Sequence, residues 1–390
     1  MRIFQTIIIA AAFLWTESRP AFAFRIYDDS VMSGYTKGQY EGFVPAGEKE
    51  KENAQLLGKA SAAELKGNYA EALESLVQVT RNEPKNKDLY CRLAYDFVKV
   101  KDFRQAESAL RQARELGRKD LWILKALGFV YFNQLKAGEA VAVLEEATAQ
   151  APADRWIHMQ LGSAYDLLAD IRKKEKDYDP QADYEKALDH TKKAVAMGGD
   201  AALYSQAGKI YGALGQFWEA LDYLHRAESA GRADAWLYSE MGWDYGMVED
   251  YREALAYFRN AEKAGRKDAW IYSKIAWSHD RLGETEQAIG EYKRALALSP
   301  GDPWSNYNLG VALRNHKDYE EAVALYLEMT RKGEYPGWTQ LQLARIYALL
   351  GMEEGARDYL QQGKKLLDTT AADVSAEIEQ IELLLNTPQK

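Results

Sequence analysis

The sequence predicts an all-α fold built from tandem helix pairs, and three observations carry this prediction. Small residues recur along two columns of the chain with a period of 34 residues. Apolar side chains inside each unit are spaced three and four residues apart, as on one face of an amphipathic helix. Residues that start and stop helices follow the same period. Together these patterns indicate a solenoid, in which each unit buries its apolar surface against the next one.

The two columns define the units. The first consists of Ala60, Ala94, Gly128, Gly162, Gly208, Gly242, Ala276, Gly310 and Ala344. The second consists of Ala72, Ala106, Ala140, Ala187, Ala220, Ala254, Ala288, Ala322 and Ala356. An aromatic side chain follows three residues after most members of the first column, and a large apolar one follows four residues after most members of the second. We therefore expect two short helices per unit, whose backbones approach at the small residues while the large side chains fill the space beside them.

The expected helix ends agree with this division. An aspartate stands just before a first helix at Asp120, Asp154, Asp200, Asp234, Asp268 and Asp302. Its carboxylate can accept from the free N–H groups of the first turn and faces the positive end of the helix dipole. A glycine suited to a left-handed stop separates the two helices of a unit at Gly67, Gly215, Gly283 and Gly351.

Residues 1–23 have the features of a secretory signal. A basic Arg2 precedes a short apolar run, and Ala21-Phe22-Ala23 offers the small residues of a cleavage site. The apolar run is about nine residues long, too short to cross about 30 Å of hydrocarbon as a helix. We expect cleavage after Ala23 and export to the periplasm or the medium, with an N-terminal membrane anchor as the alternative. No second stretch of the chain is long and apolar enough to span a membrane.

The remainder divides into three parts. Residues 24–52, rich in glycine, tyrosine and charge, match no unit and are expected to form an N-terminal arm. Residues 53–370 hold nine units, with an insertion near 170–182 in the fourth. The units begin near residues 53, 87, 121, 155, 201, 235, 269, 303 and 337. Residues 371–390 contain an amphipathic helix that can cover the open end of the last unit, followed by a tail. The insertion is either a longer helix pair or a loop, and its heavy charge favours a solvated face.

The unit pattern resembles the tetratricopeptide repeat. The fifth unit carries the family positions in order, at Tyr204, Ala207, Gly208, Tyr211, Ala220, Leu224 and Ala227. The resemblance covers about 318 of the 390 residues. It implies a right-handed α-α superhelix with a concave groove lined by the first helices, and a function in protein–protein interaction. The lysine and asparagine pattern of the family's carboxylate clamp is absent, so recognition of a chaperone tail is not expected.

Composition and motifs disfavour several other functions. The net charge of -9 argues against a protein that coats nucleic acid. One cysteine excludes a disulfide framework or a thiolate metal cluster, and the five histidines are scattered singly. The chain has no glycine-rich phosphate loop and no serine elbow. We therefore predict no catalytic residue, no metal and no cofactor.

Tryptophan is the most suggestive feature of the groove that the resemblance implies. Six units have it as second residue of the first helix, at Trp122, Trp156, Trp236, Trp270, Trp304 and Trp338. The position seven residues further along the first helix holds a tryptophan at Trp243 and Trp277, and another aromatic ring in two earlier units, at Tyr95 and Phe129. Large rigid rings are favoured anchors for protein partners, and they also stack on sugars. We predict that the partner-binding residues are Trp236, Trp243, Trp270, Trp277, Lys274, Arg281, Phe129 and Tyr95. The alternative is that the six-member column only packs between units.

The sequence thus predicts an exported, non-enzymatic scaffold that binds a protein partner through an aromatic groove. A bacterial envelope assembly or secretion system is the expected setting, with exopolysaccharide export suggested by analogy. The main alternative is direct binding of a carbohydrate by the same rings, for which the polar residues Ser239, Glu240, Lys274, Asp280 and Arg281 are compatible contacts. End-to-end self-assembly is disfavoured by the polar face of the terminal helix.

Overall fold

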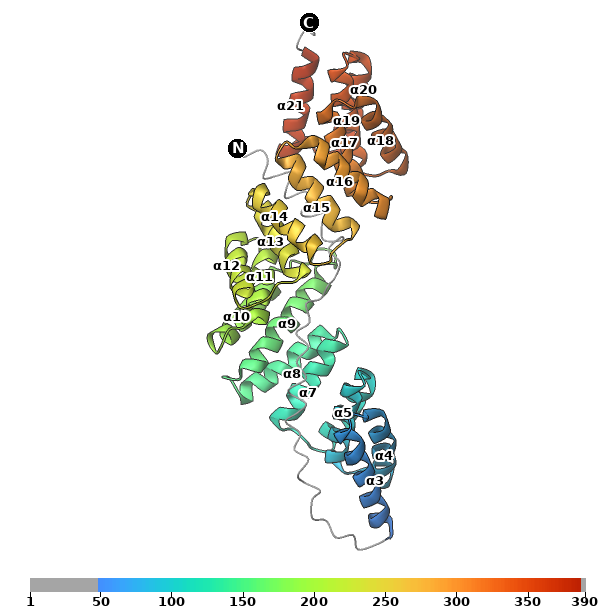
Figure 1. Ribbon diagram of the computed structural model, residues 1–390, viewed down its shortest axis with the longest axis vertical. Helices are drawn as coiled ribbons and strands as arrows, with labels where there is room; N and C mark the ends of the chain where they lie inside the picture. Colours follow the sequence, from blue (N-terminus) through green and yellow to red (C-terminus); the bar gives the residue numbers. More distant parts are fainter. Residues whose placement is uncertain (1–47, 387–390) are drawn as a thin grey trace. The chain divides into compact units, whose positions relative to one another are not determined.

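A computed structural model describes residues 48–386, which form 19 α-helices in two compact units (Figure 1). The N-terminal unit comprises the described residues up to Gln216, and the C-terminal unit begins at Phe217. The expected signal segment and most of the expected arm, residues 1–47, lie outside the described residues, as do residues 387–390. The first described helix begins at Glu48, so the expected arm ends earlier than residue 52. Glu48 and Glu50 occupy its first turn, where negative charge stabilises a helix.

The helices follow the expected pairs. The N-terminal unit contains α3 (Glu48–Leu65), α4 (Tyr69–Asn82), α5 (Lys87–Lys99), α6 (Phe103–Glu115), α7 (Leu121–Asn133), α8 (Ala137–Gln150), α9 (Arg155–Arg172), α10 (Gln181–Ala196) and α11 (Ala201–Ala213). The C-terminal unit contains α12 (Phe217–Ser229), α13 (Ala235–Met247), α14 (Tyr251–Lys263), α15 (Ala269–Arg281), α16 (Thr285–Leu298), α17 (Pro303–His316), α18 (Tyr319–Lys332), α19 (Pro336–Leu349), α20 (Glu353–Leu366) and α21 (Ala372–Asn386).

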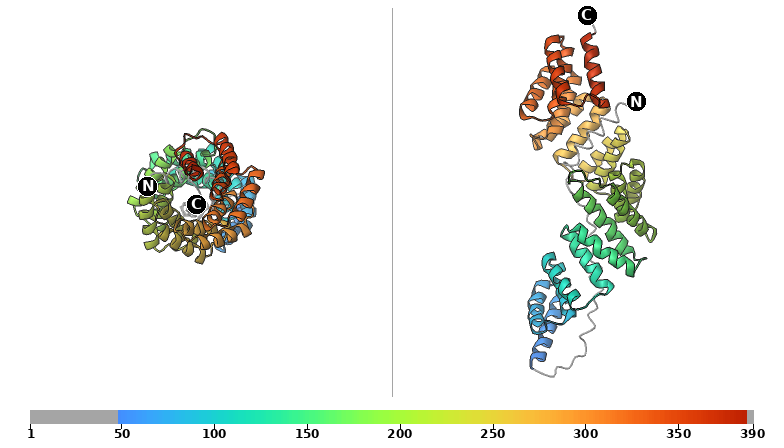
Figure 2. Two further views of the ribbon diagram at one scale, coloured as in Figure 1. Left: turned by 90° about the horizontal axis from the view of Figure 1, so that it is seen from above. Right: turned by 180° about the vertical axis from the view of Figure 1, so that it is seen from behind.

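Packing inside each unit is that of a solenoid. A first helix such as α15 contacts the second helix of its own pair, α16, and the second helix of the preceding pair, α14. Figure 2 shows the same stacking of helix pairs from behind. Small residues of the first column face large side chains of the paired helix, as Gly128 faces Leu144 and Gly310 faces Tyr326. The prediction of an all-α solenoid is confirmed.

Aspartate caps begin the first helices as expected. All six aspartates of the column accept a hydrogen bond from the backbone N–H three residues later, at distances of 2.8 to 3.1 Å. Asp302 additionally precedes Pro303 at the first helical position, where the missing N–H leaves no bond unmade. These starts depend on residues that are neighbours along the chain.

The turn inside a helix pair has a left-handed residue at an equivalent position of eight pairs. Glycine occupies it in four of them, with φ between 73° and 78°. Non-glycine residues with φ between 61° and 73° occupy it in the others, at Lys101, Leu135, Glu249 and Lys317. A left-handed conformation costs a side-chain-bearing residue about 1–2 kcal/mol. Packing of the two helices therefore imposes a backbone shape that the local residue opposes.

Leu135→Gly is expected to raise the stability of the N-terminal unit by up to about 1 kcal/mol, because relief of the left-handed strain exceeds the entropy lost by glycine. Leu135 is 48% exposed, so little packing is removed. Gly215→Ala, at the equivalent turn with φ of 73° and open space around the position of a Cβ, should lower stability. Urea unfolding of both variants provides the measurement. A loss of stability in Leu135→Gly would contradict the strain argument.

The insertion is accommodated by the fourth pair. Its helices α9 and α10 have 18 and 16 residues, whereas most others have 13 or 14. Residues 173–180 connect them. Both alternatives therefore apply in part: the two helices are longer, and most of the insertion forms the connection between them, with residues 174–177 exposed. Two of its basic residues make hydrogen bonds nearby. Arg172 donates to Tyr178 and to Asp183, and Lys173 donates to Asp170.

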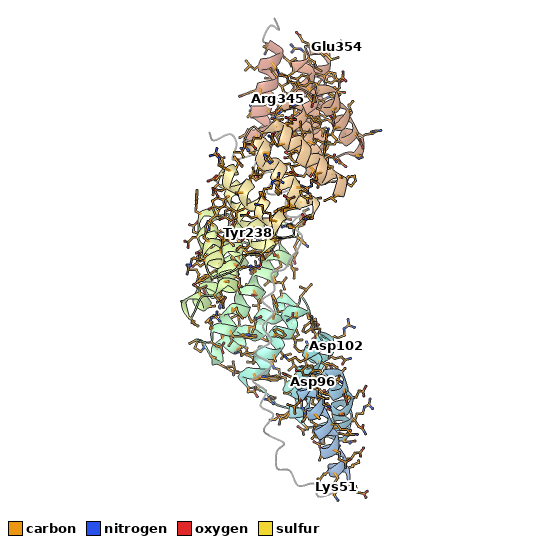
Figure 3. The ribbon with its side chains drawn as sticks, in the orientation of Figure 1. Lys51, Asp96, Asp102, Tyr238, Arg345 and Glu354 are labelled. Carbon is orange, nitrogen blue, oxygen red and sulfur yellow. The ribbon has the colours of Figure 1, made fainter. Side chains whose placement is uncertain are left out.

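The terminal helix α21 packs against α19 and α20, as the prediction of a capping helix requires. Its apolar face of Val374, Ile378, Ile381 and Leu385 joins one core cluster with Leu341, Ala344 and Leu360. Figure 3 labels Arg345 on α19, whose guanidinium binds both carboxylate oxygens of Glu377 at 3.0 and 2.9 Å. Apolar burial and an ion pair thus close this end of the C-terminal unit.

Candidate partner-binding face

The first helices of neighbouring pairs touch one another along one side of the C-terminal unit. Among the described helices, α13 contacts α15, α15 contacts α17, and α17 contacts α19. No such contact of comparable extent joins α14 with α16 or α16 with α18. The unit therefore curves with its first helices on the inside, and side chains on their inner side come together from different repeats.

Trp243 and Trp277 form a stacked pair on this side. They lie on α13 and α15, with ring centroids 6.0 Å apart and ring planes inclined by 27°. Trp243 is 9% exposed, and Trp277 is half-buried. Tyr251, the first residue of α14, packs edge-on against Trp277 at 5.4 Å. The structure thus brings the two predicted tryptophans together.

Glycine at position 246 makes room for this arrangement. A Cβ atom on Gly246 would lie 2.4 Å from the six-membered ring of Trp277. Any larger residue would push the ring out of its position. Gly246 lies three residues after Trp243 on α13 and is not part of a repeat column, so its role was not apparent in the sequence.

Lys274 joins the pair to two further tryptophans. Its ammonium nitrogen lies 3.6 Å from the ring centroid of Trp304, 5.3 Å from that of Trp243 and 5.8 Å from that of Trp270. The side chain is only 1% exposed, so its cation–π contacts are largely desolvated and strong. We call Trp243, Trp270, Trp277, Trp304 and Lys274 the tryptophan cluster. It draws on α13, α15 and α17, and Trp304 is the member that the predicted site lacked.

Trp236 and Trp270 belong to the six-member column, and their surroundings favour the packing interpretation. Arg232 lies over the Trp236 ring at 4.4 Å, and Arg266 lies over the Trp270 ring at 4.0 Å. Both guanidinium groups also donate to the capping aspartate of the same helix, at 2.7 and 3.0 Å. The same arrangement recurs at Trp122, with Arg118 at 5.3 Å. The column thus helps to build the junction between successive repeats.

Arg281 at the end of α15 contacts Tyr251 of the preceding helix, α14. Its guanidinium donates to the Tyr251 hydroxyl at 2.8 Å and lies 4.8 Å from the centroid of the same ring. Because Tyr251 also contacts Trp277, Arg281 supports the edge of the tryptophan cluster from outside.

A comparison with known protein families identifies some of these repeats. A family model described as tetratricopeptide repeat matches residues 240–303 and 273–337, which include most of α13 to α18. The tryptophan cluster falls inside this range.

The chain contains tetratricopeptide repeats.

Several solved structures resemble the chain at low sequence identity. A tetratricopeptide repeat protein from Parabacteroides merdae has a TM-score of 0.47 at 17% identity, covering 67% of this chain and 99% of its own. PilF of Pseudomonas aeruginosa has a TM-score of 0.45 at 16% identity, covering 56% of this chain and 94% of its own. YrrB, described as having an unusual peptide-binding site, has a TM-score of 0.40 at 20% identity, covering 49% and 93%. No curated protein matches the sequence significantly.

The two predicted residues of the N-terminal unit have different surroundings. Tyr95 on α5 is half-buried, with Tyr69 edge-on at 6.0 Å and the Lys99 ammonium 5.3 Å from its ring. Phe129 on α7 is fully buried and packs edge-on against Phe103 of α6 at 6.3 Å. Phe129 thus differs from the expected exposed ring, because α7 is apolar on nearly every side and buries most of its residues.

The described part of this tetratricopeptide repeat protein holds no group of three or more histidine, cysteine, aspartate or glutamate side chains that could bind a metal. Within residues 48–386, no helix is both long and apolar enough to cross a membrane. Cys91 is buried on α5, and burial raises the pKa of its thiol to about 12. A thiol with such a pKa is a poor nucleophile at neutral pH.

Proposed function

We propose that this tetratricopeptide repeat protein is an exported, non-enzymatic scaffold that binds a protein partner through the tryptophan cluster of its C-terminal unit. The observation that carries the proposal is the stacked pair of Trp243 and Trp277 on adjacent first helices. Trp277 remains half-buried, so part of its ring is available for contact. Rigid aromatic rings supply large contact area at small entropic cost, as at protein interfaces in general.

A protein partner agrees better with the polar groups around the rings than a carbohydrate does. Sugar recognition needs hydrogen-bonding groups beside the stacking ring, and the sequence offered Ser239 and Arg281. Ser239 donates to the backbone carbonyl of Ala235 at 2.6 Å, and Arg281 donates to Tyr251. Lys274 is enclosed by rings. These groups already serve packing within the chain, whereas apolar and aromatic contact suits a peptide segment or a folded domain.

The proposed setting is a bacterial envelope assembly or secretion system, with exopolysaccharide export as the favoured example by analogy. Its support is the signal-like sequence of residues 1–23, which would direct the remaining chain across a membrane. Detection of the mature N-terminus at Phe24 in an envelope fraction would support export, and retention of Met1 would oppose it.

Trp277→Ser is expected to lower recovery of the partner by tenfold or more, because loss of an anchoring tryptophan costs about 2 kcal/mol or more of binding free energy. The measurement is affinity capture by residues 24–390 from the envelope of the host, with each recovered protein identified and its binding then measured with the purified pair. Trp218→Ser is the matched control, since Trp218 is 67% exposed on the second helix α12.

The outcomes separate the candidates. One defined protein retained by Trp218→Ser and lost by Trp277→Ser supports the proposal, provided that thermal unfolding shows both variants to be folded. Trp277→Phe should retain part of the binding, since an aromatic ring remains. Equal capture by the parent and Trp277→Ser would exclude the tryptophan cluster as the protein site. Binding of the parent to envelope polysaccharide, lost in the same variant, would replace the protein partner by a carbohydrate.

A further inference from the structure

Two histidines of the fourth helix pair form a close imidazole pair. The Nδ1 atoms of His158 on α9 and His190 on α10 are 2.9 Å apart, and the two rings are stacked at 5.1 Å. His158 is 4% exposed, and His190 is half-buried. Along the sequence the five histidines stand singly, and 32 residues separate these two. Only the folding of α9 against α10 brings them together.

The hydrogen bonds assign the protons of the pair. The Nε2 atom of His158 lies 3.0 Å from the carbonyl oxygen of Pro152, which can only accept. His158 therefore carries its proton on Nε2 and presents the lone pair of Nδ1 to its partner. His190 must then donate through Nδ1. The pair is satisfied as long as one Nδ1 lacks a proton. A first added proton on Nε2 of His190 leaves the hydrogen bond between the Nδ1 atoms intact, but a second one, on Nδ1 of His158, sets two donors and two positive charges against each other.

The neighbouring groups do not remove this conflict. The Tyr165 ring of α9 covers His190 at 5.9 Å, and its hydroxyl is bound to Glu145 of α8. On α10, Asp189 pairs with Lys193 at 2.7 Å, and Lys186 lies over the Tyr165 ring at 5.3 Å. The acidic and basic groups around the pair are thus already engaged with each other or with Tyr165. Burial first, and then the nearby His158 and Lys193, lower the pKa of His190.

We propose that the His158–His190 pair is an acid-sensitive switch that loosens the α9–α10 helix pair when the protein is acidified. Helix α9 also contacts α7, α8 and α11. Its loosening therefore changes the packing between the first helices α7, α9 and α11 of the N-terminal unit. Because the pKa of His190 is lower in the folded than in the unfolded chain, the stabilisation is complete above about pH 6.5 and is lost as the pH falls below that value.

Hydrogen–deuterium exchange of the full chain at pH 7.5 and pH 5.0 tests the switch, with rates corrected for the intrinsic effect of pH. Helices α5 and α6 contain no histidine and provide the internal reference. We expect protection of α9 and α10 to fall about tenfold relative to α5 and α6 at pH 5.0 in the parent. In His190→Gln this loss should disappear, because glutamine keeps a hydrogen-bonding group and takes up no proton. His316→Gln, at an exposed histidine, should behave as the parent does.

A change in α9 and α10 that equals the change in α5 and α6, or that persists in His190→Gln, would overturn the proposal. If His190→Gln does not fold at pH 7.5, a titration of the histidine ring protons of the parent by NMR takes its place. The switch requires that the pair takes up its two protons in two separated steps, the second of them clearly below pH 6.5. A single ordinary step for both rings would overturn it.

Discussion

Lys209→Met is expected to lower the free energy of unfolding of the N-terminal unit by about 3 kcal/mol or more, because it removes the cation from a largely buried ion cluster. The Lys209 ammonium on α11 lies 2.6 Å from Asp166 and 3.0 Å from Asp170 on α9. Lys173 and the Tyr184 hydroxyl also bind Asp170, at 2.7 Å each. Methionine has similar length but leaves Asp166 without its countercharge. Urea unfolding followed by circular dichroism measures the loss.

Two further variants make this test specific. Lys193→Met removes a half-exposed lysine from an ion pair with Asp189 and should cost less than about 0.5 kcal/mol. Adding Asp166→Asn to Lys209→Met should recover part of the stability, because the isolated charge is removed as well. Equal losses for Lys209→Met and Lys193→Met would show that burial does not strengthen the cluster.

The cluster also predicts an acid dependence. Burial acts to raise the pKa of Asp170, but the charges of Lys209 and Lys173 outweigh it and hold that pKa well below its ordinary value. Since the folded pKa is the lower one, its stabilisation is present above about pH 4 and is lost as the pH falls further. This range lies below that of the histidine pair, so the two effects can be separated by pH.

Phe258→Ala is expected to lower the free energy of unfolding of the C-terminal unit by about 4 kcal/mol. Phe258 on α14 is fully buried, and Trp270 of the tryptophan cluster packs edge-on against it at 5.9 Å. The ring lies beneath Gly242 of α13, where a Cβ atom would be only 2.7 Å from it. Removal of the ring opens a cavity between two helices that cannot fully close. Denaturant unfolding measures the effect, and tryptophan fluorescence reports the change around Trp270.

Gly242→Ala completes a double-mutant cycle with Phe258→Ala. Alone, the added methyl group should overpack the ring and cost about 1–2 kcal/mol despite the better helix propensity of alanine. In the double variant the methyl group enters the cavity. The loss of unfolding free energy in the double variant should therefore be about 1 kcal/mol smaller than the sum of the losses in the two single variants. Gly290→Ala on α16 is the matched control. No atom lies within 4 Å of its Cβ position, so it should stabilise. Strictly additive losses would contradict the direct contact.

The sequence was sufficient for features that depend on neighbours along the chain. Each capping aspartate binds an amide three residues away, so the starts of the first helices could be predicted one by one. The repeated pairing of Gly242 with Phe258 follows from the same period, because a small residue and a large one recur sixteen positions apart. The clustering of Trp243 with Trp277 was also accessible, since 34 residues separate them and successive first helices touch.

Other residues of these sites make contacts that do not recur from one repeat to the next. Lys274 was predicted as a partner contact, yet three tryptophans from three helices enclose it. Lys209 reaches Asp166 across 43 residues, because the insertion breaks the regular spacing in the fourth pair. His158 and His190 meet for the same reason, on two lengthened helices that pack against each other. A column of equivalent positions cannot reveal a contact that occurs once.

The amino-acid sequence by itself determined the repeat, its helix pairs and their caps, because these follow from spacing and from bonds between near neighbours. The tertiary structure decided which side chains are buried, which charges are paired and which backbone strain is tolerated. Leu135 shows the difference most simply. Leucine has no tendency toward a left-handed conformation, and it adopts one because the packing of α7 against α8 yields more free energy than the strained turn costs.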